Sequence, residues 1–98
     1  MTETEHILTC LSEECGEVIQ AASKALRFGL NNKNPKTGVI NKDHLIAEIT
    51  DVVAVINILV ERGILDDDKI MNENALEAKA KKLNNYLIYA KDVGAIHD

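Results

Sequence analysis

The sequence predicts a small all-α protein: three main helices in an antiparallel helical bundle completed by oligomerisation. Its 98 residues, 46% hydrophobic and with one proline and five glycines, suit one domain over residues 1–98 and argue against a many-turned β fold. Its apolar residues recur at helical spacing over long stretches. A chain this short buries only about 60–65% of its unfolded surface, so we expect further copies to complete the core.

The first helix is expected from about Glu3 to Phe28, and Gly29 suits its C-terminal end. At about 100° per residue, its apolar side chains fall within an arc of about 120°, as in an amphipathic helix. These side chains are Ile7, Leu8, Leu11, Cys15, Val18, Ile19, Ala22, Ala25 and Leu26.

Residues 30–42 predict a loop, because asparagine, proline and glycine interrupt the pattern there, and loops of this length are often functional. A second helix is expected from about Asp43 to Arg62, with Asn41 or Asp43 as its cap and Gly63 after it. It is apolar nearly all round, which is typical of the buried centre of an assembly. Its β-branched residues would also suit a strand, but a length of about 20 residues favours a helix.

The third helical stretch follows a cap signal of three aspartates at residues 66–68. It runs to about Asp92, with a break expected near Asn72, and Gly94 follows it. Its apolar stripe consists of Leu76, Ala80, Leu83, Leu87 and Ala90.

Charge and composition exclude several classes of protein. A net charge of −5 argues against general nucleic-acid binding, which needs clustered basic residues. The longest apolar stretch is too short to span a membrane, and the polar, acidic start lacks the pattern of a secretory signal. Cys10 and Cys15 point about 140° apart on one helix, so they cannot pair within it. Two free thiols in a chain with no secretory signal suggest the reducing conditions of the cytoplasm. We therefore expect a cytoplasmic protein, and the charge and apolar stretches indicate no nucleic-acid or membrane partner.

Acidic residues carry the chemical signal of the sequence. Glu13, Glu14 and Glu17 cover an arc of about 100° beside the apolar face of the first helix. Three glutamates on one helix are more often a solvated face than a site. Glu48 and Asp51, by contrast, lie one turn apart on the apolar second helix, where burying a bare carboxylate costs several kcal/mol.

No Lys or Arg lies between Lys42 and Arg62, so no basic residue near Glu48 and Asp51 in the sequence neutralises their charges. A divalent cation would do so. Oxygen ligands, and the absence of a Cys or His ligand pattern, favour Mg²⁺ or Mn²⁺ over Zn²⁺.

The order Glu-Glu-x-x-Glu, then Glu-x-x-Asp on the next helix, resembles the signature of the all-α nucleoside triphosphate pyrophosphohydrolases, the MazG-like superfamily. Residues 11–24 and 48–59 look like its two core helices. Residues 78–83 with Tyr86 look like the basic third helix of its small phage and bacterial members. The resemblance covers about residues 6–90.

This resemblance implies Mg²⁺-dependent hydrolysis of a nucleoside triphosphate to the monophosphate and pyrophosphate. Glu14, Glu17, Glu48 and Asp51 match the metal ligands. Glu13 matches the first acid of the motif, with a water-orienting or supporting role in catalysis. The resemblance also implies an obligate oligomer, a homodimer or homotetramer.

Lysines are the candidate substrate contacts. Lys24 lies on the acidic side of the first helix, and Lys79 and Lys82 are neighbours on the third. Lys24 can equally be a plain surface lysine, and for Lys79 and Lys82 a solvated face is slightly favoured over a substrate contact. His44 lies on the acidic side of the second helix, where a helix-start histidine without a catalytic role is favoured. Phe28 can stack on a base, although packing is the favoured role.

Two other functions fit the same residues. Phosphoribosyl-ATP pyrophosphohydrolases belong to the same superfamily and break the same kind of bond. A helical metal- or nucleotide-binding regulator would keep the acids without turnover, and pyrophosphate release separates it from both enzymes.

Overall fold

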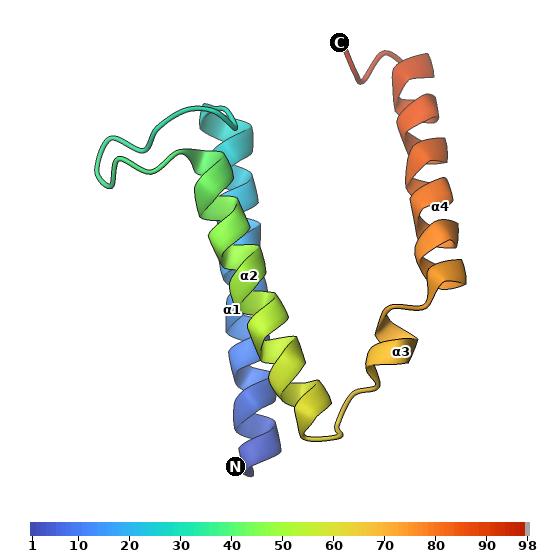
Figure 1. Ribbon diagram of the computed structural model, residues 1–98. Helices are drawn as coiled ribbons and strands as arrows, with labels where there is room; N and C mark the ends of the chain where they lie inside the picture. Colours follow the sequence, from blue (N-terminus) through green and yellow to red (C-terminus); the bar gives the residue numbers. More distant parts are fainter. Residues whose placement is uncertain (98) are drawn as a thin grey trace. The chain divides into compact units, whose positions relative to one another are not determined.

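The computed structural model describes residues 1–97 and contains four helices, shown in Figure 1: α1 (Glu3–Phe28), α2 (Asn41–Glu61), α3 (Asp67–Ile70) and α4 (Glu73–Asp92). Its backbone forms no strand within that range, only one isolated bridge between Lys33 and Ile40, so the predicted all-α class is confirmed. Among the described residues, no helix combines the length and apolar composition of a membrane span.

The chain separates into two compact units, Met1–Leu65 and the residues from Asp66 onward, and each is considered by itself. The first holds α1 and α2, and the second holds α3 and α4. The interpretation of residues 1–98 as one functional domain stays a prediction.

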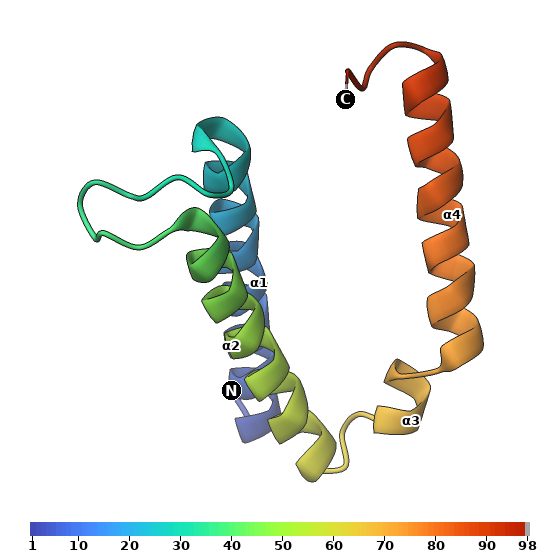
Figure 2. The same ribbon diagram turned by 45° about the horizontal axis from the view of Figure 1, so that its top comes forward.

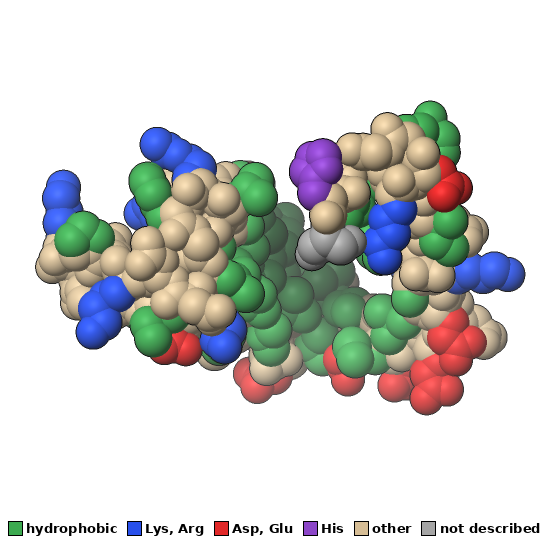
Figure 3. Space-filling view, turned by 90° about the horizontal axis from the view of Figure 1, so that it is seen from above, with side chains coloured by type: hydrophobic (Ala, Val, Ile, Leu, Met, Phe, Trp, Pro, Cys, Tyr) green, Lys and Arg blue, Asp and Glu red, His purple; other side chains and the backbone are tan. Residues whose placement is uncertain are grey.

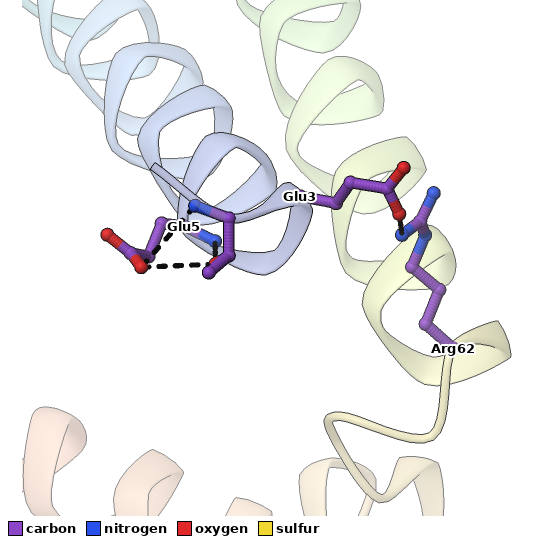
Figure 4. Close-up of polar contacts among 4 residues, drawn as sticks. Glu3, Glu5 and Arg62 are labelled. Atoms are coloured by element: carbon purple, nitrogen blue, oxygen red, sulfur yellow. Dashed lines mark hydrogen bonds and ion pairs between the residues drawn. The ribbon is translucent and has the colours of Figure 1, made fainter.

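Helix α1 begins with a capping box. The Thr2 hydroxyl accepts a hydrogen bond from the Glu5 backbone N–H at 3.1 Å, and the Glu5 carboxylate accepts one from the Thr2 N–H at 3.4 Å. Figure 4 shows this box beside an ion pair of 3.0 Å between Arg62 Nη1 and Glu3 Oε2. The ion pair joins the start of α1 to the residue that follows α2. Gly29 ends α1 at φ 99°, a conformation that glycine adopts at no steric cost.

Helices α1 and α2 lie side by side and antiparallel, as Figures 1 and 2 show from two directions. We call the line along which they pack the α1/α2 seam. Its buried and half-buried positions alternate at spacings of three and four, as in a coiled coil. They are Ile7, Leu11, Glu14, Val18, Ala21 and Ala25 on α1, and Asn41, Leu45, Glu48, Val52, Val55 and Leu59 on α2.

The start of α2 differs from the prediction. The helix begins at Asn41, its N-cap is Ile40, and no side chain caps it, so the expected cap by Asn41 or Asp43 is wrong. Asn41 is only 5% exposed, and its side-chain Nδ2 donates to the Gly29 carbonyl at 2.9 Å. Its amide thus binds the end of α1 to the start of α2.

The second unit begins with the cap that the three aspartates predict. The Asp66 carboxylate accepts hydrogen bonds from the backbone N–H groups of Asp68 and Lys69, which starts α3. The Asn72 side chain accepts from the Ala75 N–H at 2.9 Å and starts α4. The predicted break near Asn72 is therefore confirmed, and its cause is a second cap.

Much apolar surface is uncovered in a single copy of the chain, and Figure 3 shows hydrophobic side chains at the surface of both units. Ala21 and Leu59 are its only fully buried hydrophobic residues within the described range. On α2, Ile46, Ile49 and Val53 are 55%, 45% and 48% exposed. The burial of this face by another copy, expected from the sequence, stays a prediction.

Candidate metal centre

Four acidic side chains from two helices meet at one point of the α1/α2 pair. Glu14 and Glu17 come from α1, and Glu48 and Asp51 come from α2. One carboxylate oxygen of each lies within 4.8 Å of the others. These are the four residues that the sequence predicts as metal ligands.

The spacing of the acids explains why they meet. Glu14 and Glu48 occupy seam positions, and apart from Asn41 the remaining seam positions are filled by apolar residues. Glu17 and Asp51 each follow three residues later, at exposed positions that flank the seam. The cluster therefore has an inner pair of half-buried carboxylates and an outer pair open to solvent.

Two carboxylate oxygens inside the cluster have no partner. Oε2 of Glu14 and Oε2 of Glu48 are inaccessible to solvent and accept no hydrogen bond from the described residues. Buried polar atoms are almost always hydrogen-bonded, because an unpartnered one costs free energy. Both atoms are oxygen acceptors, so the missing partner is a proton donor or a cation.

The electrostatics of the inner pair show the same lack of positive charge. Burial is the main cause that raises the pKa of Glu14, followed by hydrogen bonding to the Glu17 carboxyl group and the nearby negative charges. Hydrogen bonding to Glu17 is the main cause that raises the pKa of Glu48, followed by burial and the charges of Glu17 and Asp51. Without a cation, the raised pKa values of Glu14 and Glu48 mean that the folded cluster disfavours their charged forms.

His44 contacts the cluster from the preceding turn of α2. Its Nε2 lies 3.2 Å from Oε1 of Glu48, and its charge opposes the rise in the pKa of that glutamate. The sequence favoured no functional role for His44, although its position four residues before Glu48 was a usable signal. Glu48 thus presents one oxygen to His44 and leaves the other, Oε2, without a partner.

The donor set fits a hard divalent cation. All four groups are carboxylates, and two of them hold a buried oxygen that a cation would satisfy. Mg²⁺ and Mn²⁺ prefer oxygen ligands, whereas structural zinc sites use thiolate and imidazole. The outer pair leaves one side of the cluster open, so bound cations would remain accessible to an anionic ligand.

The other candidate residues lie outside this cluster. Glu13 is exposed on α1 and is not among the four grouped acids. Lys24 is half-buried and lines a cavity beside the loop between α1 and α2. Lys79 and Lys82 belong to α4 in the second unit, where Lys82 Nζ lies 5.9 Å from the centre of the Tyr86 ring.

Comparisons with protein-family models, with curated proteins and with solved structures gave no match. The four-carboxylate cluster and its two unpartnered oxygens are thus the main structural observations that bear on function.

Proposed function

We propose that this chain is a Mg²⁺-dependent nucleoside triphosphate pyrophosphohydrolase that cleaves a ribo- or deoxyribonucleoside triphosphate to the monophosphate and pyrophosphate. One observation carries the proposal: Oε2 of Glu14 and Oε2 of Glu48 are buried without partners inside a cluster of four carboxylates. The resemblance of the two acidic motifs to the MazG-like superfamily supports the choice of reaction.

The roles of the carboxylates follow from their burial. Glu14 and Glu48 would hold the inner side of the cation, and Glu17 and Asp51 the outer side. When bound, Mg²⁺ polarises a phosphoryl oxygen, lowers the pKa of a bound water and neutralises charge on the leaving pyrophosphate. His44 fixes one oxygen of Glu48 and thereby directs the other into the cluster.

The chain's uncovered apolar surface supports a homodimer or homotetramer as the working form. Ile46, Ile49 and Val53 expose a stripe on α2, and α4 has no buried residue. Both cysteines are free, which suits the reducing conditions of the cytoplasm.

The test is product analysis with the full-length chain. The protein is stripped of metal with a chelator, reloaded with Mg²⁺ and incubated with ribo- and deoxyribonucleoside triphosphates. Phosphorus NMR should then show a monophosphate and pyrophosphate in equal amounts, and no product before Mg²⁺ is restored.

Two variants make the test specific to the cluster. Glu48→Gln removes an inner ligand while preserving shape, and it should lower turnover by about a hundredfold or more, because metal placement supplies several kcal/mol of charge stabilisation. Glu61→Gln, an exposed glutamate of the same helix outside the cluster, is the matched control and should turn over normally. Orthophosphate as the first product would refute the proposal. Metal binding without cleavage of any nucleotide would indicate a regulator instead.

A further inference from the structure

A second feature of the first unit is a basic cavity at the loop between α1 and α2. Its volume is about 660 Å³, and we call it the loop pocket. Figure 3, seen from above, shows Lys and Arg side chains in blue around this end of the unit. Residues that line the pocket include Lys24, Phe28, Lys33, Asn34, Lys36 and Asn41.

The charge of the loop pocket is not compensated. Three lysines line it, and no aspartate or glutamate is among its described lining residues. The ion pairs within residues 1–97 join His44 to Glu48 and Arg62 to Glu3, so none involves these lysines. Three ammonium groups around one cavity favour a ligand with several negative charges.

The loop that presents the lysines is ordered by its own asparagines. The Asn34 side chain accepts hydrogen bonds from the backbone N–H groups of Lys36 at 2.9 Å and Thr37 at 3.4 Å. The Asn32 side chain donates to the Phe28 carbonyl at 2.9 Å, which ties the loop to the end of α1. These bonds hold the backbone that carries Lys33 and Lys36.

A smaller cavity adjoins the loop pocket. Its volume is about 280 Å³, and it shares Lys24, Asn34 and Asn41 with the loop pocket. His44 also lines it, and His44 Nε2 is 3.2 Å from the Glu48 carboxylate. Shared lining residues and His44 thus link the loop pocket to the neighbourhood of the Glu48 carboxylate.

We propose that the loop pocket binds the terminal phosphates of the nucleoside triphosphate, the part that leaves as pyrophosphate. This inference rests on the proposed function and adds an orientation for the substrate. The terminal phosphates carry most of the negative charge of a triphosphate, whereas the base and sugar carry none. Three uncompensated lysines therefore match the phosphate end, and the acidic cluster lies at the scissile bond.

The competing orientation places the nucleobase in the loop pocket, against the Phe28 ring. The Arg27 guanidinium carbon lies 4.9 Å from the centre of that ring, so a cation already occupies one of its faces. Stacking there would leave the charge of Lys33 and Lys36 unmatched, which favours the phosphate orientation.

Calorimetric titration of the full chain tests the proposal, with inorganic pyrophosphate as the probe and Mg²⁺ present. The double variant Lys33→Gln/Lys36→Gln removes two charges from the pocket and should weaken pyrophosphate binding by about tenfold or more, as expected for the loss of charge-assisted contacts. The control Lys42→Gln/Lys91→Gln removes the same charge from exposed positions outside the pocket and should change the affinity by less than about twofold. Adenosine, which has no phosphate, should bind both variants equally.

Three results would overturn the proposal: no pyrophosphate binding by the unchanged chain, equal affinity in both double variants, or selective loss of adenosine binding in the pocket variant. The measurement needs no turnover, so it separates the two proposals. If the chain cleaves no nucleotide but the pocket variant binds pyrophosphate more weakly, the loop pocket is a phosphate site and the proposed enzymatic function is wrong. If the chain cleaves nucleotides but the pocket variant binds pyrophosphate as well as the unchanged chain, the proposed function stands and the proposed role of the loop pocket is wrong.

Discussion

His44 and Glu48 form a pair across one turn of α2, with Nε2 and Oε1 3.2 Å apart, and the second Glu48 oxygen lies buried in the acidic cluster. The contact gives His44 a positioning role, because it restricts the rotation of a side chain that is 16% exposed. Loss of a residue that orients a metal ligand in this way typically costs about 10–100-fold in metal affinity or in activity.

His44→Ala should accordingly weaken Mn²⁺ binding by about tenfold, as is typical when the partner of a metal ligand is removed. Turnover at saturating metal should fall far less than in Glu48→Gln, because all four carboxylates remain. Calorimetric titration with Mn²⁺, paired with rates over a range of Mg²⁺ concentrations, checks both parts. His6→Ala is the control, since His6 lies outside the cluster. Equal Mn²⁺ affinity in the two histidine variants would contradict the positioning role.

Mg²⁺ should raise the melting temperature of the chain. An ion that binds the folded cluster and not the unfolded chain adds about 2.7 kcal/mol of stability at a concentration of a hundred times its Kd. Scanning calorimetry with and without Mg²⁺ measures the shift. Glu48→Gln should reduce the shift, whereas Glu61→Gln should preserve it. If Mg²⁺ leaves the melting curve of the unchanged chain in place, the four carboxylates are not a metal site.

The metal-free chain should lose stability as the pH rises. The pKa values of Glu14 and Glu48 are raised in the folded state, Glu14 first by burial and Glu48 first by its bond to Glu17. In the unfolded chain both groups titrate near the ordinary value of 4.5. The folded state therefore binds more protons between that pH and the raised pKa values, and its advantage declines across this window.

Urea unfolding in chelator, followed from pH 4.5 toward neutrality, measures this decline. Glu14→Gln/Glu48→Gln imitates the protonated pair and should show a flatter dependence on pH than the unchanged chain. Mg²⁺ should reverse the sign for the unchanged chain, because the ion binds deprotonated carboxylates. Parallel profiles for the two proteins would show that the inner pair does not control the effect.

Helix boundaries were largely predictable because periodicity and caps are local properties. Gly29 ends α1 and Asp66 caps α3 as expected, whereas Asn72 caps α4 at a point where the sequence predicts only a break. The start of α2 was not predictable from local signals, since the Asn41 side chain bonds the Gly29 carbonyl twelve residues away instead of capping its own helix. A long-range contact thus overrode a local preference.

Part of the candidate site could likewise be predicted from the sequence, and part could not. Glu14 and Glu48 share seam positions in two antiparallel helices, so their meeting follows from the sequence pattern. The loop pocket could not be predicted from a sequence pattern, because side-chain hydrogen bonds of Asn34 and Asn32 place Lys33 and Lys36 within an aperiodic loop. Lysine content predicts a basic loop, but only the folded backbone brings three lysines around one cavity.

Exposed apolar residues on α2 predict that copies of the chain associate. Ile46, Ile49 and Val53 follow one another at spacings of three and four and are 55%, 45% and 48% exposed, which describes a second packing stripe beside the seam. We expect a homodimer or homotetramer whose interface buries well over about 1,200 Å², the upper end of weak contacts. Light scattering at micromolar concentration should therefore give at least twice the mass of one chain.

The double variant Ile49→Asp/Val53→Asp should shift the mass toward the monomer, because the interface between copies would then have to bury two unpaired negative charges. Ala54→Asp, exposed on another side of α2, is the control and should keep the oligomer. A monomeric mass for the unchanged chain would contradict this prediction.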